Sequence, residues 1–215
     1  MRLAVQSGEL AAVEKAYADY LGVEGNRNVV SDAEATELLA DARARSGDIA
    51  SALELYRSLA DTPQPEDKKR STLVKLGLAS NPARAALALP FILDGRASTL
   101  KKAVDGLPDD LMVGYLAARR LYQDKRLPEA LDALSAILAR LEAAPAPSRP
   151  EEQWLPWVTR ETARLIAEGF WLLERFVDAE AAYLRVAALT PYGGDAERYR
   201  DLAEWAAWKT RRASP

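Results

Sequence analysis

The sequence GDIASALELY, residues 47–56, decides the fold of this chain. A close copy, ERFVDAEAAY, occupies residues 174–183. In each copy a turn leads into a helix that carries a small alanine and, four residues later, a tyrosine. These are Ala52 and Tyr56 in the first copy and Ala179 and Tyr183 in the second. Residues four apart share one helix face, so the alanine permits close contact with another helix. Because one such unit cannot bury its apolar face alone, its recurrence predicts a stacked array of helical hairpins.

Nearly every other segment also predicts helix, because apolar residues recur at intervals of three and four and almost nowhere alternate. The predicted helices span residues 9–21, 31–45, 48–60, 67–79, 82–94, 97–105, 109–123, 127–143, 156–173, 176–189 and 195–211. Pro90 predicts a kink inside the helix over 82–94. Residues 1–6 resemble the end of a further helix. The sequence therefore predicts an all-α fold.

Composition excludes several classes of function. The chain of 215 residues is 49% hydrophobic and 28% charged, which is typical of a folded soluble protein. A net charge of -3 gives no overall attraction to nucleic acid. Without any His or Cys, the chain lacks the residues for the common zinc sites, for a cysteine nucleophile, for a Ser-His-Asp triad and for disulfides. No glycine-rich phosphate loop occurs either, so we expect neither a metal nor a cofactor.

No segment predicts a membrane span. The longest strongly apolar stretch, residues 85–93, is interrupted by Pro90 and is far shorter than the roughly 20 residues that a span needs. The first nine residues lack the apolar core of a signal peptide. As written, the chain is expected to be cytoplasmic. A periplasmic or other extracytoplasmic place is expected instead if the chain is a fragment of a longer protein, because its first hairpin begins with a truncated helix.

The repeated hairpins carry a family resemblance. The hairpin that ends at Pro191 has small, apolar and aromatic residues at fixed spacing, namely Ala163, Ile166, Ala167, Phe170, Ala179 and Tyr183. The hairpin over residues 33–63 keeps Leu39, Ala40, Ala52 and Tyr56. On these residues the chain resembles the tetratricopeptide repeat proteins. The hairpins over 67–94 and 111–141 match less well. The equivalent small packing residues of five hairpins are Val13, Ala52, Ala86, Ala130 and Ala179.

The resemblance implies a right-handed superhelical array of antiparallel helical hairpins, an α-solenoid. We expect one domain over residues 1–215, with the proline-rich stretch 143–150 as a long loop inside it; a domain boundary there is the alternative. Solenoids need a terminal helix to cover their last apolar face. The helix over 195–211 fits that role, with Tyr199, Leu202 and Trp205 on its packed side.

The resemblance also implies a non-catalytic scaffold that binds a peptide or a partner helix in a concave groove. First helices of the hairpins line that groove in the family. The contact candidates on these helices are Thr36, Arg43, Arg119, Tyr122, Arg160 and Arg164. The alternative is an accessory helical domain of a larger enzyme or envelope assembly whose activity lies outside this chain. The sequence identifies neither the partner nor the oligomeric state.

Tryptophans and paired carboxylates are the other candidates for a site. All five tryptophans follow residue 153, and they either fill the core or form a partner-binding patch. Those expected to be exposed partner contacts are Trp154, Trp157 and Trp208. The carboxylate pairs at 109–110 and 151–152 lie at helix starts, where the helix dipole alone favours acids. We therefore expect no enzyme active site.

Overall fold

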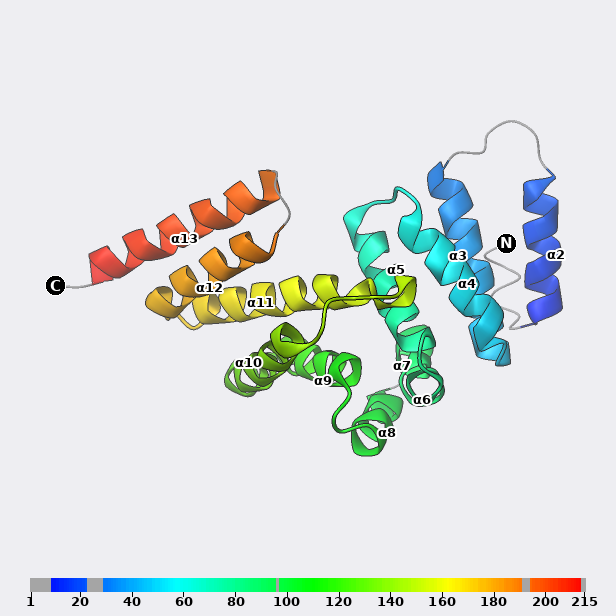
Figure 1. The fold of residues 1–215 in the computed structure, drawn as a ribbon, viewed down its shortest axis with the longest axis horizontal. Helices are drawn as coiled ribbons and strands as arrows, with labels where there is room; N and C mark the ends of the chain where they lie inside the picture. Colours follow the sequence, from blue (N-terminus) through cyan, green and yellow to red (C-terminus); the bar gives the residue numbers. More distant parts are fainter. Residues whose placement is uncertain (1–8, 23–28, 96, 191–193, 214–215) are drawn as a thin grey trace. The chain divides into compact units, whose positions relative to one another are not determined.

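The computed structural model describes residues 9–22, 29–95, 97–190 and 194–213, and all regular structure in these residues is helical (Figure 1). Consecutive helices pack side by side in pairs, which confirms the predicted all-α fold class. The helix end predicted at residues 1–6 and Pro191 lie outside the described residues.

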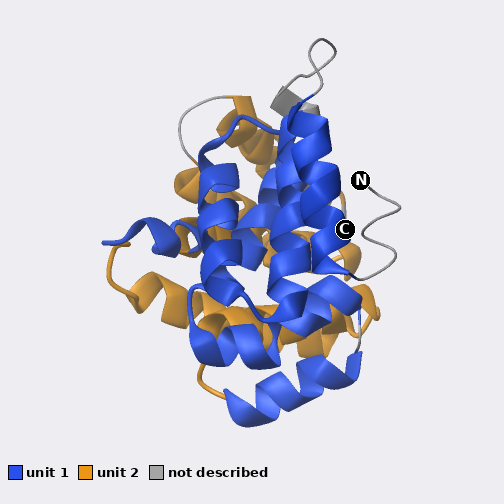
Figure 2. Ribbon diagram, turned by 90° about the vertical axis from the view of Figure 1, so that its right-hand side faces the viewer, with its two compact units in different colours: residues 1–107, 148–154 blue, residues 108–147, 155–215 orange. Residues whose placement is uncertain are grey.

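The described helices belong to two compact units, which Figure 2 colours separately. Unit 1 comprises residues 1–107 and 148–154, and unit 2 comprises residues 108–147 and 155–215. The helices of unit 1 are α2 (Leu10–Leu21), α3 (Val29–Ser46), α4 (Ile49–Asp61), α5 (Glu66–Ala79), α6 (Pro82–Leu87), α7 (Leu89–Asp94), α8 (Ala97–Gly106) and the 3-10 helix η1 (Pro150–Glu152). The helices of unit 2 are α9 (Leu111–Gln123), α10 (Leu127–Ala143), α11 (Trp154–Leu172, whose first residue belongs to unit 1), α12 (Phe176–Leu189) and α13 (Gly194–Ala213). The single-domain organisation stays a prediction.

The proline-rich loop between α10 and η1 is anchored at its end by Glu152. This carboxylate accepts hydrogen bonds from the backbone N–H of Ser148 (2.9 Å) and of Arg149 (3.2 Å) and from the Arg149 guanidinium. These hydrogen bonds lower the pKa of Glu152 to about 2. The neighbouring Glu151 pairs with Arg57 of α4 at 3.5 Å. Both acids of the 151–152 pair therefore have structural partners.

The hairpins α3–α4, α9–α10 and α11–α12 share one turn. One or two positions after the first helix of each comes a residue with left-handed backbone, which is Gly47 (φ 90°), Lys125 (φ 63°) or Glu174 (φ 57°). The next residue donates its N–H to the carbonyl five positions earlier, as in Asp48 N to Arg43 O at 3.0 Å, and the same bond closes the other two turns. This Schellman geometry satisfies the last carbonyls of the first helix and reverses the chain.

The small packing residue predicted for each hairpin is buried in four of five cases. Ala52, Ala130 and Ala179 each lie at the fourth position of the second helix and are 0% exposed, and Val13 is 1% exposed. The residue four positions after each alanine is also buried, as Tyr56, Leu134 and Tyr183 are. The second helices therefore pack through equivalent positions, as the repeated sequence predicts.

The prediction for Ala86 is wrong. Ala86 is exposed, and its neighbour Ala85 is buried instead. The segment over 82–94 forms two short helices, α6 and α7, because the chain breaks at Ala88 (φ -109°, ψ -30°) ahead of Pro90. A proline cannot donate the backbone hydrogen bond that a continuous helix would need. The kink predicted at Pro90 is thus confirmed, and it shifts the buried position by one residue.

The last helix, α13, packs against α12 through small residues. Ala196, Ala203 and Ala206 are at most 4% exposed, whereas Trp205 is 62% exposed. Trp205, which was expected on the packed side of this helix, lies at the edge of that side: most of it is exposed, but its ring stacks on Trp171 of α11. Alanines seven and three residues apart form a continuous helix face, and this face meets α12.

We predict that Lys125→Gly and Glu174→Gly each raise the free energy of unfolding by about 1 kcal/mol, because left-handed backbone costs a non-glycine residue that much. Urea denaturation of the purified chain measures the change. As a control, Ala136→Gly on the exposed face of α10 should lower the free energy of unfolding by about 1 kcal/mol. Destabilisation by all three substitutions would contradict the turn geometry.

Candidate functional site

Three tyrosines and one arginine gather on unit 2. Tyr122 comes from α9, Tyr183 from α12 and Tyr199 from α13, and each ring is electrostatically coupled to Arg164 of α11. Tyr183 is buried, whereas Tyr122 and Tyr199 are half-buried and remain accessible. We call these three residues, together with Arg164, Glu161 and Glu168, the tyrosine cluster. It joins four helices of unit 2 at one place.

The charged centre of the tyrosine cluster is already paired. Arg164 donates two hydrogen bonds to Glu161, at 2.8 Å from Nε and 2.7 Å from Nη2, and its Nη1 donates to Glu168. The hydrogen bonds with Glu161 raise the pKa of Arg164, which therefore stays charged. Both carboxylates lie on the same helix as the arginine, at the i−3 and i+4 positions. The centre thus carries two acids and one base, all of them engaged.

The tyrosine hydroxyls, in contrast, are available. None of Tyr122, Tyr183 and Tyr199 forms a hydrogen bond within the described residues. Burial raises the pKa of all three hydroxyls, and the negative charge of Glu168 adds to the effect on each of them. The pKa of Tyr183 rises to about 12. At neutral pH each hydroxyl therefore keeps its proton and can both donate and accept a hydrogen bond.

The structure brings only some of the predicted contact residues together. Tyr122 and Arg164 belong to the tyrosine cluster. Arg119, one turn before Tyr122 on α9, is half-buried and has no ion pair or hydrogen bond within the part of the chain that is described. Arg160 on α11 is also half-buried. Arg164, a contact candidate, is already engaged, because Glu161 and Glu168 of its own helix accept hydrogen bonds from its guanidinium.

Other predicted contacts lie in unit 1 and have internal partners. Thr36 on α3 donates a hydrogen bond to the carbonyl of Asp32 at 2.8 Å and lies 3.3 Å from the Tyr17 hydroxyl. Arg43, on the same helix, pairs with Glu14 of α2 at 3.2 Å. Both side chains therefore connect α3 to α2. A partner that bound them would have to compete with these contacts.

The expected exposure of Trp154 and Trp157 is wrong. Trp154 is 3% exposed, with the Arg84 guanidinium 4.9 Å from its ring centre. Trp157 is 6% exposed and makes an edge-to-face contact with Tyr115, at 6.1 Å between ring centres. Trp208 is 40% exposed, as predicted. The first two rings contribute apolar area to the interior, which is the commoner use of tryptophan.

Sequence reasoning missed a buried ion network in unit 1. Lys75 of α5 is only 6% exposed, and its Nζ lies 2.7 Å from Glu37 Oε1 and 2.8 Å from Asp41 Oδ2, both on α3. The Tyr56 hydroxyl of α4 donates to the same Asp41 at 2.8 Å. The network fixes three helices to each other. A buried cation with two hydrogen-bonded carboxylates is satisfied, so we assign it to stability rather than to binding.

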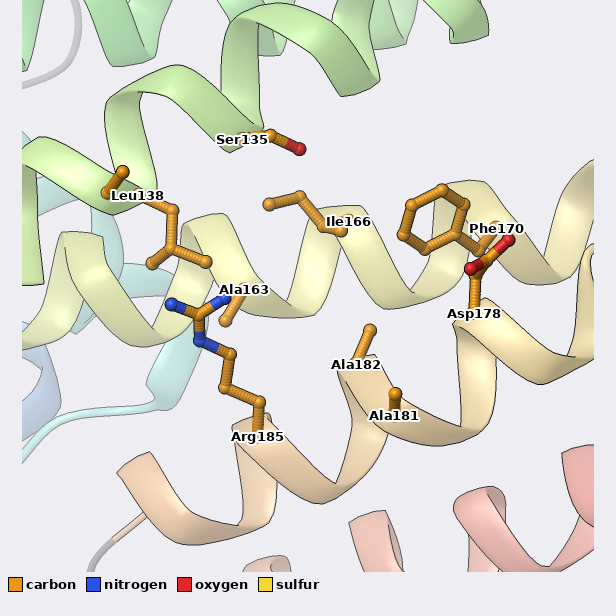
Figure 3. Close-up of a pocket in the computed structure, with 10 residues that line it drawn as sticks. Ser135, Leu138, Ala163, Ile166, Phe170, Asp178, Ala181, Ala182 and Arg185 are labelled. Carbon is orange, nitrogen blue, oxygen red and sulfur yellow. The ribbon is translucent and has the colours of Figure 1, made fainter.

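A pocket of about 280 Å³ lies among α10, α11 and α12 (Figure 3). Its apolar wall includes Leu138, Ile166 and Phe170. The two charged residues at its rim form ion pairs: Arg185 pairs with Glu142 at 2.8 Å, and Asp178 pairs with Arg175 at 2.8 Å. Ligand sites usually combine an apolar pocket with convergent polar groups. The charged groups of this pocket are engaged in ion pairs, so the tyrosine cluster is the better candidate for a binding site.

Comparison of the chain with known protein families, with curated proteins and with solved structures found no match. The described residues contain no group of three or more acidic side chains placed to hold a metal ion. No single described helix is long and apolar enough to cross a membrane; α5 with α6 and α7 reaches that length and composition only as a pair, across a bend of 113°. The candidate site therefore rests on the burial, the charges and the hydrogen bonds of the described residues.

We predict that Lys75→Met lowers the free energy of unfolding by about 3 kcal/mol, because it leaves the buried carboxylates of Glu37 and Asp41 without their cation. Urea denaturation at neutral pH measures the loss. Arg120→Met is the control: it removes the exposed ion pair with Asp124, 2.9 Å away, and such pairs are worth at most about 1 kcal/mol. Equal losses in both variants would contradict the assignment.

We also predict a specific loss of stability in alkali. The folded-state pKa of Tyr183, about 12, is above the ordinary value of 10, so its contribution is complete below pH 10 and is lost as pH rises toward 12. Tyr183→Phe should flatten the fall of the unfolding free energy between pH 10 and 12 by an amount on the order of 2 kcal/mol. Ser135→Ala, which removes no titrating group, should leave the slope unchanged. Identical slopes for Tyr183→Phe and the unmodified chain would exclude this role of Tyr183.

Proposed function

We propose that this protein is a divergent tetratricopeptide-like solenoid and acts as a non-catalytic scaffold for a protein partner. Three hairpins that close with the same turn and bury an alanine at the same position support the repeat architecture. A final helix that packs on the preceding one through alanines supports the capping role of α13. The right-handed superhelix is the arrangement that such hairpins form in the family.

The absence of catalysis is part of the proposal. Asp110 caps α9 by accepting from the N–H groups of Met112 and Val113, and Glu152 anchors the loop before α11. Where carboxylates converge, on Lys75 and on Arg164, a cation already lies between them. A catalytic pair needs carboxyl groups with room for a substrate at a defined separation. These carboxylates are better explained by structural roles.

The tyrosine cluster is the proposed binding surface, and its unbonded hydroxyls carry the proposal. First helices α9 and α11 and the capping helix α13 supply its accessible members, as the family's groove requires. A peptide or partner helix would place polar groups against Tyr122 and Tyr199, and Arg119 provides a cation that has no ion pair among the described residues. The mechanism is preorganised shape and hydrogen bonding, with no bond made or broken.

The location of the surface can be tested by photo-crosslinking. We predict that p-benzoylphenylalanine at position 122 or 199 captures a discrete partner from cells that express the chain. The same probe at Leu184, which is 50% exposed on the outer face of α12, should not capture it. Capture at Leu184 alone would place the partner on the second helices and overturn the proposal.

The role of the hydroxyls is tested with the partner so identified. Tyr122→Phe with Tyr199→Phe should weaken binding about tenfold, since each lost hydrogen bond costs about 0.5–1.5 kcal/mol. Isothermal titration calorimetry gives the affinity. Tyr17→Phe, which removes a hydroxyl from unit 1, should leave it unchanged. The same affinity for the double variant and the unmodified chain would remove the hydroxyls from the mechanism.

A further inference from the structure

Exposed apolar side chains concentrate at one end of unit 2. Leu172 ends α11 and is 53% exposed, Val177 begins α12 and is 65% exposed, and Trp205 and Trp208 on the last turns of α13 are 62% and 40% exposed. These four residues form what we call the aromatic end, together with the rings of Trp171 and Phe176. Figure 1 shows the turn between α11 and α12 and the last part of α13 on the same side of the unit.

Ring contacts hold this end together. Trp171 stacks on Trp205 with 6.1 Å between ring centres and an interplanar angle of 11°. Phe176 meets Trp171 edge to face at 5.3 Å. Three helices are thus joined by aromatic contacts, yet one face of the assembly remains in solvent. A cluster of exposed large apolar side chains on one surface commonly marks an interaction site.

Cations surround the exposed rings. Residues 205–213 contain Lys209, Arg211 and Arg212 and no acid, although the chain as a whole carries a net charge of -3. The Arg212 guanidinium lies 4.4 Å from the Trp208 ring centre, and Lys209 Nζ lies 5.9 Å from that of Phe176. None of these three cations forms an ion pair within the described residues. The last turns of α13 are therefore positive, although Glu204 precedes Trp205 and Glu174 lies in the turn between α11 and α12.

We propose that the aromatic end of unit 2 docks onto the surface of an anionic lipid bilayer. Tryptophan rings prefer the headgroup region, apolar side chains insert just below it, and unpaired Lys and Arg are attracted to lipid phosphates and carboxylates. The aromatic end supplies all three kinds of group on adjacent helix ends. Docking of this kind lies in the interface and does not require a helix that crosses the membrane.

The shape of the surface favours a bilayer over a peptide. Leu172 and Val177 flank the turn between α11 and α12, and Trp205 and Trp208 lie on α13, so the exposed apolar side chains come from the ends of three helices. Peptide-binding surfaces usually receive their ligand in a groove or pocket. The pocket of unit 2 is lined by other residues and includes none of these four. Exposed apolar side chains with cations beside them fit an anionic bilayer, because the apolar groups can insert below the headgroups while the cations contact them.

Vesicle sedimentation tests the proposal with the full chain. We expect it to sediment with vesicles of phosphatidylcholine and phosphatidylserine, to remain in solution with phosphatidylcholine alone, and to release from the anionic vesicles at high salt. The fluorescence of the exposed tryptophans should shift to shorter wavelength on binding. Absence of sedimentation with anionic vesicles would overturn the proposal. Concentration-dependent self-association lost in Trp205→Ser, without vesicle binding, would assign the surface to a second copy of the chain.

Variants locate the binding. Lys209→Glu with Arg212→Glu should weaken vesicle binding at least tenfold, and Trp205→Ser with Trp208→Ser should abolish the fluorescence shift. Leu184→Ser, which removes an exposed apolar side chain of α12 away from this end, is the matched control and should bind as the unmodified chain does. Circular dichroism establishes that each variant is folded. Undiminished vesicle binding by both double variants would exclude the aromatic end as the docking surface.

The lipid proposal is separable from the scaffold proposal. Tyr122→Phe with Tyr199→Phe alters the tyrosine cluster and should leave vesicle binding unchanged. The two charge reversals on the last turn of α13 should in turn leave the affinity for a crosslinked protein partner unchanged. A loss of both activities in either double variant would show that one surface serves both, and would overturn the assignment of the lipid surface to the aromatic end alone.

Discussion

Burial of an alanine at the fourth position of the second helix is the constraint on which each hairpin depends. Ala52, Ala130 and Ala179 have no exposed surface, and a larger side chain at these positions would have to displace the helix packed against it. The same tightness is seen at Gly169, where an added Cβ would lie 2.8 Å from Leu131. Because interhelical distance is fixed here, the faces of α9, α11 and α13 are held at the spacing that brings the tyrosine cluster together.

Local signals explain why the sequence predicted the helices so closely. The turns, the caps and the interval of apolar residues are all encoded within a few positions, and helix ends predicted from them agree with the structure to within a few residues. The prediction of Ala86 as a packing residue is wrong because the alignment assumed one continuous helix. The break at Ala88 shifts which residues face the core. A prediction that assumes a single helical period across the segment cannot detect such a shift.

The features of the site that could not be predicted from the sequence depend on contacts between residues far apart in the chain. Glu161 and Glu168 stand three before and four after Arg164, so the pairing that consumes this arginine was readable from helical spacing. Tyr122, Tyr183 and Tyr199 come from three other helices, so helical spacing could not predict that they lie near Arg164. Lys75 likewise finds Glu37 and Asp41 across 38 and 34 residues. In both networks opposite charges satisfy each other internally, which leaves neutral hydroxyls as the available recognition groups.

Helix α13 links the two proposed surfaces. One side of it contributes Tyr199 to the tyrosine cluster, and its last turns carry Trp205 and Trp208 at the aromatic end. It is held to α12 by alanines, each of which buries little apolar area compared with a leucine or an aromatic ring. A partner that contacts Tyr122 and Tyr199 at once would bridge α9 and α13, and so stabilise the docked position of α13 by mass action. Since both surfaces require the same docked helix, occupancy of either would favour the other, and linkage makes that coupling reciprocal.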